Sequence, residues 1–287
     1  MSIGQLARGG LPQAVRTAGK KDWLFLAAMA VLAVAVLLAL VGRWVAPYDP
    51  TALYVGPVNG VVSLSHPLGT DDLGRDILSR LLHGASVSLF GPVAIVLFST
   101  LLGAGLAISA AWFGGWIQAV VARLVDVIFA IPGLVLAVLA VAMFGKGLVA
   151  PIAALSIAYI PVVARVTQTA ASRELGKPYF AALRVQGVSA PAMWFRHLVP
   201  ALVPMLSAQF AVGFGYAMLD LAAISFLGLG QQPPASDWGS MISSGKSSIL
   251  AGAPEQALFA SLAVIVTVLA VSIVGARVTT LAEEKER

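Results

Sequence analysis

The sequence predicts an all-α, polytopic membrane protein with about six transmembrane helices, and three observations support this fold class. Hydrophobic residues make up 59% of the 287 positions and charged residues only 11%, whereas a soluble domain has about 25% charged residues. Several uncharged apolar runs reach about 20 residues, the length that a helix needs to cross a membrane. The lysines and arginines lie in short segments beside these runs. The formal net charge of +5 therefore does not indicate a nucleic-acid partner.

The apolar runs define the individual spans. The first, 23–42, could instead be a cleaved signal peptide, but the apolar core of such a peptide is shorter and ends at a small-residue cleavage site. An uncharged stretch at 84–122 is divided by a turn at 114–116. A later run contains Pro132 and Gly133, which membrane helices tolerate when neighbouring groups satisfy the freed carbonyl. The predicted spans are 23–42, 86–110, 127–145, 147–164, 198–226 and 256–276.

The distribution of positive charge predicts the orientation of these spans. If the N-terminus is cytoplasmic, five Lys and Arg residues fall outside and thirteen fall inside. This imbalance favours cytoplasmic N- and C-termini. The resulting organisation is a cytoplasmic N-terminal segment at 1–22, a first helix with its extracytoplasmic loop at 23–83, a transmembrane core at 84–276 that contains the cytoplasmic loop 167–199, and a cytoplasmic tail at 277–287.

The cytoplasmic loop 167–199 is long for a connection between two spans. We expect it to form two short helices, at 177–186 and 190–198. Gly187 fits a helix C-cap, where the backbone needs a left-handed residue, and Ser189 can cap the second helix. The small, partly apolar surface of this loop either docks in a groove of another protein or lies on the membrane surface.

A spacing motif in and just after this loop helps to decide between docking and a position on the membrane surface. Its residues are Ala181, Ala182, Leu183, Gly187, His197, Val199 and Pro200. The spacing resembles the cytoplasmic "EAA" loop of ABC importer permeases, in which a Glu-Ala-Ala triplet precedes the glycine and a Leu-Pro pair ends the motif. The Gly and Pro positions match, whereas Ala181 stands where the family has Glu. The resemblance implies that the loop, with Tyr179 and Arg184 beside the motif, couples to an ATPase.

Other segments resemble the dipeptide/oligopeptide/nickel permease family. They are HPLGTDDLGRDILSRLL at 66–82, WFGGW at 112–116, RLVD at 123–126 and SFLGLGQQPPASDWG at 225–239. Importers of this family contain two different permeases. These segments, together with the long loop 43–83, are similar to the second of the two, the C-type permease. The resemblance implies the type I ABC importer transmembrane-domain fold, with 84–276 as the core ABC transmembrane domain.

The resemblance also implies a function and a set of partners. The chain would be a non-catalytic permease subunit in a bacterial or archaeal cytoplasmic (inner) membrane, transporting peptides or a related small solute. It would pair with a homologous permease, two ABC ATPase subunits that bind ATP and Mg²⁺, and an extracytoplasmic substrate-binding protein. The chain itself would bind no cofactor or metal. The loop 228–252 would face the binding protein, and its candidate contact residues are Gln231, Pro233, Asp237 and Trp238.

The acidic residues outside the coupling loop need separate interpretation. Asp71 lies in an acidic stretch that lacks the ligand spacing of an EF-hand, so we expect Thr70 or Asp71 to cap an interfacial helix. Asp126 can pair with Arg123. Asp220, in the fifth predicted span, either lines the pathway or bonds neighbouring helices, because a carboxylate at this depth should face protein or water.

Two other classes of function remain alternatives. An ion-coupled secondary transporter usually shows inverted repeats with broken helices at matching positions, and no such repeat is evident. A membrane-embedded enzyme needs acid, base or metal groups that converge at one depth, whereas Asp126 and Asp220 fall at opposite faces of the predicted topology. The sequence Gly245-Lys246-Ser247 lacks the upstream glycine of a phosphate-binding loop, so we expect no nucleotide site in the chain.

Overall fold

A computed structural model describes residues 13–285 of the chain. Residues 1–12 and 286–287, which belong to the predicted N-terminal segment and tail, lie outside the described part. The described residues are almost entirely helical, with a long irregular segment between the first two helices. The helices are α1 (Gln13–Val45), α2 (Ile77–Phe113), α3 (Gly115–Phe129), α4 (Gly133–Phe144), α5 (Val149–Leu175), α6 (Pro178–Val185), α7 (Ala190–Met193), the π-helix η1 (Trp194–Leu198), α8 (Val199–Phe226), α9 (Trp238–Leu250) and α10 (Glu255–Lys285).

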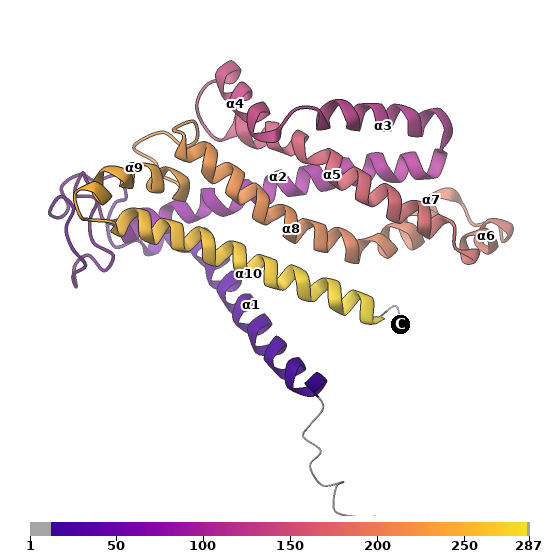
Figure 1. Ribbon diagram of the computed structural model, residues 1–287, viewed down its shortest axis with the longest axis horizontal. Coiled ribbons are helices and arrows are strands. Elements are labelled where there is room, and N and C mark those ends of the chain that lie inside the picture. The colour runs from indigo at the N-terminus through magenta and orange to yellow at the C-terminus, as the bar shows by residue number, and fades with distance from the viewer. Residues whose placement is uncertain (1–12, 286–287) are drawn as a thin grey trace, which may run out of the picture.

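Helices α2, α5, α8 and α10 run lengthwise through the molecule, α3 and α4 lie along one side of them, and α6, α7 and α9 lie at the two ends (Figure 1). Helix α9 and the segment 46–76 form one end, called the α9 end, and α6 with α7 forms the other, called the α6 end. Helix α1 meets the bundle near the α9 end and then diverges from α10. Within the described residues, five helices are long and apolar enough to cross a membrane, or six if one bent pair is a single span. The predicted fold class is confirmed.

The bent pair consists of α3 and α4, whose axes differ by 76°. We had expected one span at 127–145, but α3 begins directly after Gly114 and ends at Phe129. The break has a local cause: Pro132 lacks an amide hydrogen and disfavours helical geometry in the residue before it. The proline therefore divides this span. The predicted turn at 114–116 is confirmed, since Gly114 has φ +62° between α2 and α3.

Helix α2 extends beyond the predicted span 86–110 at both ends. Its N-cap is Asp76, whose carboxylate accepts a hydrogen bond from the amide of Ser79 at 2.8 Å. The expectation that Thr70 or Asp71 caps a separate interfacial helix is therefore wrong. The carboxylate of Asp71 is instead occupied by arginines, and the helix that Asp76 starts continues without interruption into the membrane span.

Two helix boundaries also differ from those of the predicted spans. Helix α1 begins by Gln13 rather than near Trp23, because lysine and alanine are good helix formers and do not end a helix where it leaves the membrane. Helix α5 continues to Leu175, so the first part of the predicted loop 167–199 extends the fourth span.

Small residues set the distances between helices in the core. A Cβ atom added to Gly103 of α2 would lie 3.0 Å from the backbone oxygen of Ile160 in α5, and one added to Gly213 of α8 would lie 3.3 Å from Val96. These contacts agree with the packing role expected of small residues in membrane helices. Gly105 has no such neighbour within 4 Å.

Candidate functional site

Local sequence signals define both ends of α6. Pro178 lies in the first turn, where its missing N–H has no helical partner to lose. After the helix, Gly187 has φ +75°. The amide of Gly187 donates to the carbonyl of Arg184, and the amide of Val188 donates to the carbonyl of Leu183, both at 3.1 Å. This pattern is a Schellman motif, and it confirms the predicted C-cap at Gly187.

Phe180 anchors one face of α6 to the rest of the chain, and its side chain is completely buried. The Phe180 cluster, as we call it, joins the short helix to α2, α5 and α8; its other buried members are Ile108, Ala171, Met193, Leu198 and Leu202. Burial of such an aromatic side chain contributes about 2 kcal/mol. Phe180 is not among the site residues that the sequence predicts. The signal that could have found it is the apolar pair Phe180 and Leu183, three positions apart on one helical face.

The opposite face of α6 is open. Ala181, Ala182 and Arg184 are exposed, and Val185 is 90% exposed. The small side chains leave this face low and smooth, as a docking helix requires. The structure thus brings together the exposed residues that the sequence singled out, on the side of α6 away from the Phe180 cluster.

Polar contacts fix the junction between α5 and α6. The hydroxyl of Tyr179 donates to Glu174 Oε1 at 2.7 Å, and Lys177 Nζ lies 2.7 Å from Glu174 Oε2. Burial and the adjacent Glu174 carboxylate raise the pKa of Tyr179 above its usual value, so the hydroxyl stays protonated as the donor. The guanidinium of Arg184 lies 5.6 Å from the ring centroid of Trp112 in α2.

The last three residues of the motif, His197, Val199 and Pro200, lie in a continuous helical stretch. It runs from Ala190 to Phe226 through α7, η1 and α8. Pro200 falls in the first turn of α8, where proline fits a helix, and the helical stretch continues through it. The second short helix is therefore the start of the fifth span, and its displacement would be transmitted directly along α8.

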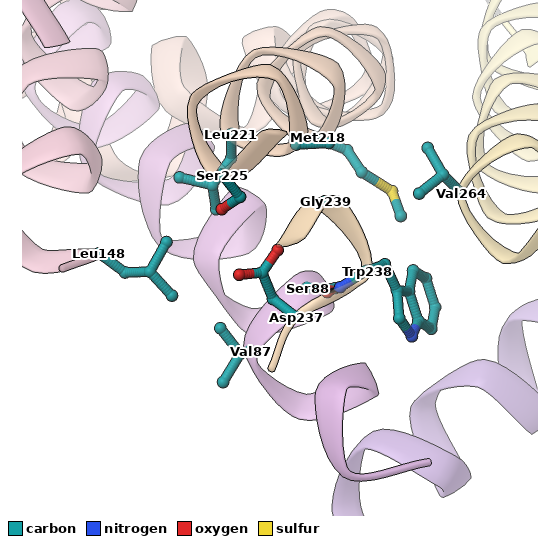
Figure 2. A pocket seen from close by; sticks show the side chains of 11 residues that line it. Val87, Ser88, Leu148, Met218, Leu221, Ser225, Asp237, Trp238, Gly239 and Val264 are labelled. Carbon is teal, nitrogen blue, oxygen red and sulfur yellow. Dashed lines mark hydrogen bonds between the residues drawn. The ribbon is translucent and has the colours of Figure 1, made fainter. Parts of the chain in front are cut away.

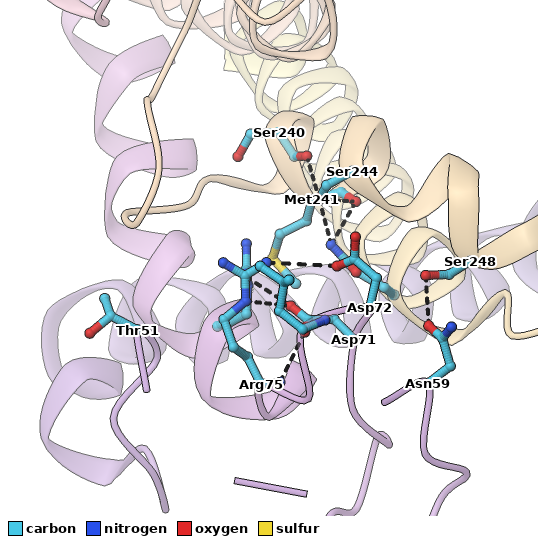
Figure 3. Close-up of polar contacts among 12 residues, drawn as sticks. Thr51, Asn59, Asp71, Asp72, Arg75, Ser240, Met241, Ser244 and Ser248 are labelled. Atoms are coloured by element: carbon cyan, nitrogen blue, oxygen red, sulfur yellow. Dashed lines mark hydrogen bonds and ion pairs between the residues drawn. The ribbon is translucent and has the colours of Figure 1, made fainter. Parts of the chain in front are cut away.

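A buried ion-pair cluster organises the α9 end (Figure 3). Asp71 Oδ2 accepts from Arg75 Nε at 2.7 Å and from Arg80 Nη1 at 2.9 Å. Its other oxygen accepts from the amides of Leu73 and Arg75, both at 2.9 Å. These three side chains, called the Asp71 cluster, tie the irregular segment to the first turn of α2. Among the described residues, no group of three or more His, Cys, Asp or Glu side chains could hold a metal ion.

Asp237 and Trp238 lie inside the chain, with 4% and 5% exposure. Asp237 caps α9 in a capping box with Ser240, and Figure 2 shows its carboxylate pointing toward Ser225 of α8. Burial raises the pKa of Asp237. The ring of Trp238 packs in the main core. The expectation that these two side chains contact a binding protein needs correction, because both are turned into the bundle.

Other residues at the α9 end are accessible. Pro233 is exposed and Gln231 is half-buried. Asn59 Oδ1 accepts a hydrogen bond from Ser248 Oγ at 2.8 Å (Figure 3), so the segment before α2 and helix α9 form one continuous surface.

Asp220 lies at an open cavity of about 340 Å³ between α5 and α8, and the lining includes the exposed side chains of Val212 and Tyr216. Asp220 Oδ2 accepts a hydrogen bond from the hydroxyl of Tyr159 in α5 at 2.9 Å. The carboxylate thus bonds a neighbouring helix, one of the two roles that the sequence left open, and it also lines this cavity. Asp126, the other carboxylate, pairs with Arg165 Nη2 at 2.8 Å rather than with Arg123, because α3 lies along α5 and brings these side chains together.

The chain also matches known proteins. Residues 99–287 match the family described as "Binding-protein-dependent transport system inner membrane component". The chain belongs to this family of ABC importer permeases. The permease also matches, over residues 16–59, the family described as "N-terminal TM domain of oligopeptide transport permease C", which confirms the peptide type suggested by the sequence.

Similar proteins cover nearly the whole permease. It is 34% identical over 273 residues to the glutathione transport system permease protein GsiD of Pectobacterium atrosepticum, covering 92% of this chain and 90% of the relative. It is also 34% identical over 272 residues to the proteins of the same name from Escherichia coli O6:K15:H31 and Shigella boydii serotype 4, covering 92% of this chain and 89% of each relative. The permease is therefore a subunit of an ABC importer.

Proposed function

We propose that this permease forms half of a translocation pathway for peptides or a related small solute, together with a homologous permease in a heterodimer. Two ABC ATPase subunits would dock below the pair of permeases, one of them on the exposed face of α6. An extracytoplasmic substrate-binding protein would deliver the solute to the α9 end. The observation that carries this proposal is the two-sided construction of α6, which is anchored by Phe180 on one face and open on the other.

In this proposal the α6 end, with the N- and C-termini, lies in the cytoplasm of a bacterial or archaeal cell. The charge distribution supports this orientation, because most Lys and Arg residues then lie on the cytoplasmic side. The exposed cationic Arg184 would lie there, next to the ATPase.

ATP and Mg²⁺ would bind only to the partner ATPases, and the permease would do no covalent chemistry. Movement of an ATPase against α6 would be transmitted through the Phe180 cluster, which contacts α2, α5 and α8 together. Because packed interiors are stiff, these helices would shift as a unit and alternate the pathway between inward- and outward-open states.

The names of the relatives, which specify glutathione transport, support a peptide-like solute. We propose a small peptide or a peptide-like solute as the cargo, with much of the selectivity residing in the binding protein. At the α9 end, Gln231 and Pro233 are the accessible residues proposed to lie near that protein.

The test is solute uptake into proteoliposomes that contain both permeases, with ATPases and binding protein added. The proposal predicts uptake that requires ATP on the side of the liposome membrane where the ATPases are bound. This uptake should stop when the catalytic residues of the ATPases are inactivated. Uptake that persists without the ATPases, driven by an imposed ion gradient, would favour a secondary transporter.

A further inference from the structure

The open cavity between α5 and α8 contains a carboxylate that has no cationic partner among residues 13–285. Asp220 accepts a hydrogen bond from the neutral hydroxyl of Tyr159 at 2.9 Å. A charged side chain inside a membrane span is costly and usually marks a pathway or a binding site. The carboxylate can therefore bind a cation that comes from outside the described residues.

The surroundings of Asp220 suit an organic cation better than a metal ion. Calcium takes six or more oxygen ligands, whereas the charged lining of this cavity is a single carboxylate. Tyr159 and Tyr216 both line the same cavity, and Tyr216 is 64% exposed. Aromatic rings attract ammonium groups through cation–π interactions, and an ammonium group offers three N–H donors to oxygen acceptors.

The lining of the cavity also indicates the length of the solute that it can hold. Gln209, Gly213, Tyr216 and Asp220 follow one face of α8 at intervals of three or four residues, so the stripe is about 16 Å long at 1.5 Å per residue. An extended peptide advances about 3.4 Å per residue. The stripe can therefore hold a peptide of about five residues.

We infer that this cavity is a binding subsite for the ammonium group of the transported solute, with the N-terminus of a short peptide at Asp220 and its backbone along the α8 stripe toward Gln209. This inference rests on the proposed function, because it assigns the cavity to the cargo of the importer. It adds a second selection step, in which Asp220 favours solutes with a free amine. This step acts after the binding protein has released the solute.

The absence of cysteine from the chain allows a direct test in the complete complex, with the other subunits made cysteine-free. Val212→Cys places a thiol in the cavity while keeping its polar residues. Its modification rate is measured with cationic aminoethyl methanethiosulfonate and with anionic sulfonatoethyl methanethiosulfonate, with Asp220 present and in Asp220→Asn. A matched control, Ala150→Cys, lies in a separate cavity beside Lys146.

We expect the cationic reagent to react at least about tenfold faster than the anionic one at Val212→Cys, and this ratio to fall toward one in Asp220→Asn. Ala150→Cys should not show the cationic preference. Trialanine should slow the modification of Val212→Cys, and N-acetyl-trialanine should not. An unchanged ratio in Asp220→Asn, or equal protection by the two peptides, would overturn the inference.

The inference can fail separately from the proposed function. Uptake that depends on ATP, combined with no charge preference in the cavity, would reject the ammonium subsite and leave the importer role standing. If Asp220→Asn does not assemble, Asp220→Glu takes its place and should retain the cationic preference. The comparison of trialanine with its acetylated form then decides the question in the unaltered cavity.

Discussion

The backbone amide of Trp238 donates a hydrogen bond to Ser88 Oγ at 2.9 Å, across 150 positions of sequence. The indole Nε1 of the same residue donates to the carbonyl of Leu81 at 3.0 Å. Trp238 starts α9, and both acceptors belong to α2. The two bonds and the buried ring hold α9 against the first turns of α2, so this end of the permease forms one rigid unit.

Removal of the Trp238 ring should destabilise the permease. Trp238→Ala leaves a cavity between α9 and α2 and should lower the free energy of unfolding by about 3 kcal/mol. Thermal unfolding in detergent measures the change. Trp44→Ala is the matched control, since this ring is 66% exposed and its loss should cost less than about 0.5 kcal/mol. Equal effects of the two substitutions would show that the Trp238 contacts do not contribute to stability.

The Asp71 cluster should depend strongly on its carboxylate. Asp71→Asn leaves two buried guanidinium groups beside a neutral amide and should cost about 3 kcal/mol. Asp72→Asn serves as the control, because Asp72 is partly exposed and lies 3.9 Å from Arg75. Limited proteolysis of the segment before α2 should detect opening in the first variant and not in the second. Resistance of both variants to cleavage would contradict the role assigned to Asp71.

The turn after α6 should control coupling. Proline fixes φ near −65° and cannot adopt the φ of +75° seen at Gly187. Gly187→Pro should therefore misplace α6 relative to α7 and reduce uptake, while ATP hydrolysis and membrane insertion continue. Gly176→Ala is the control, because Gly176 has φ −78°, which alanine adopts readily. Normal uptake by Gly187→Pro would count strongly against a coupling role for this turn.

A bulky side chain on the open face of α6 should block docking. Ala182→Trp adds an indole to the exposed face without disturbing the Phe180 cluster, so the variant should insert normally but fail to copurify with the ATPases. Ala182→Ser changes the volume little and should behave like the parent protein. Copurification of Ala182→Trp at the parent level would exclude this face as the ATPase contact.

The membrane class and the α6 turn could be predicted because each depends on local sequence. Apolar runs of membrane length determine the spans, and Gly187 followed by Ser189 and Pro191 is a local pattern for one helix ending and the next beginning. The 76° bend at Pro132 was not predicted, since proline can either kink or divide a membrane helix, and tertiary contacts decide which.

The partners of polar side chains could not be predicted because they come from distant segments. Asp126 has Arg123 nearby in sequence, yet α5 brings Arg165 to it. Trp238 lies in a loop between spans, where an aromatic side chain is expected at an interface, but the groove beside α2 buries it. Phe180 was missed because α6 has only eight residues, too few to define an apolar face with certainty.

The most direct test of the account uses a photoreactive group on α6. Gln186→Cys, an exposed position at the end of α6 beside the docking face, is labelled with benzophenone maleimide in this cysteine-free chain. The complete importer is reconstituted, and the cross-linked proteins are identified by mass spectrometry. We expect cross-links from Gln186→Cys to the ATPase. The same label at Leu250→Cys, a 92% exposed position at the α9 end, should give none to it. Cross-links to the ATPase from Leu250→Cys, and none from Gln186→Cys, would contradict the proposed coupling surface and orientation.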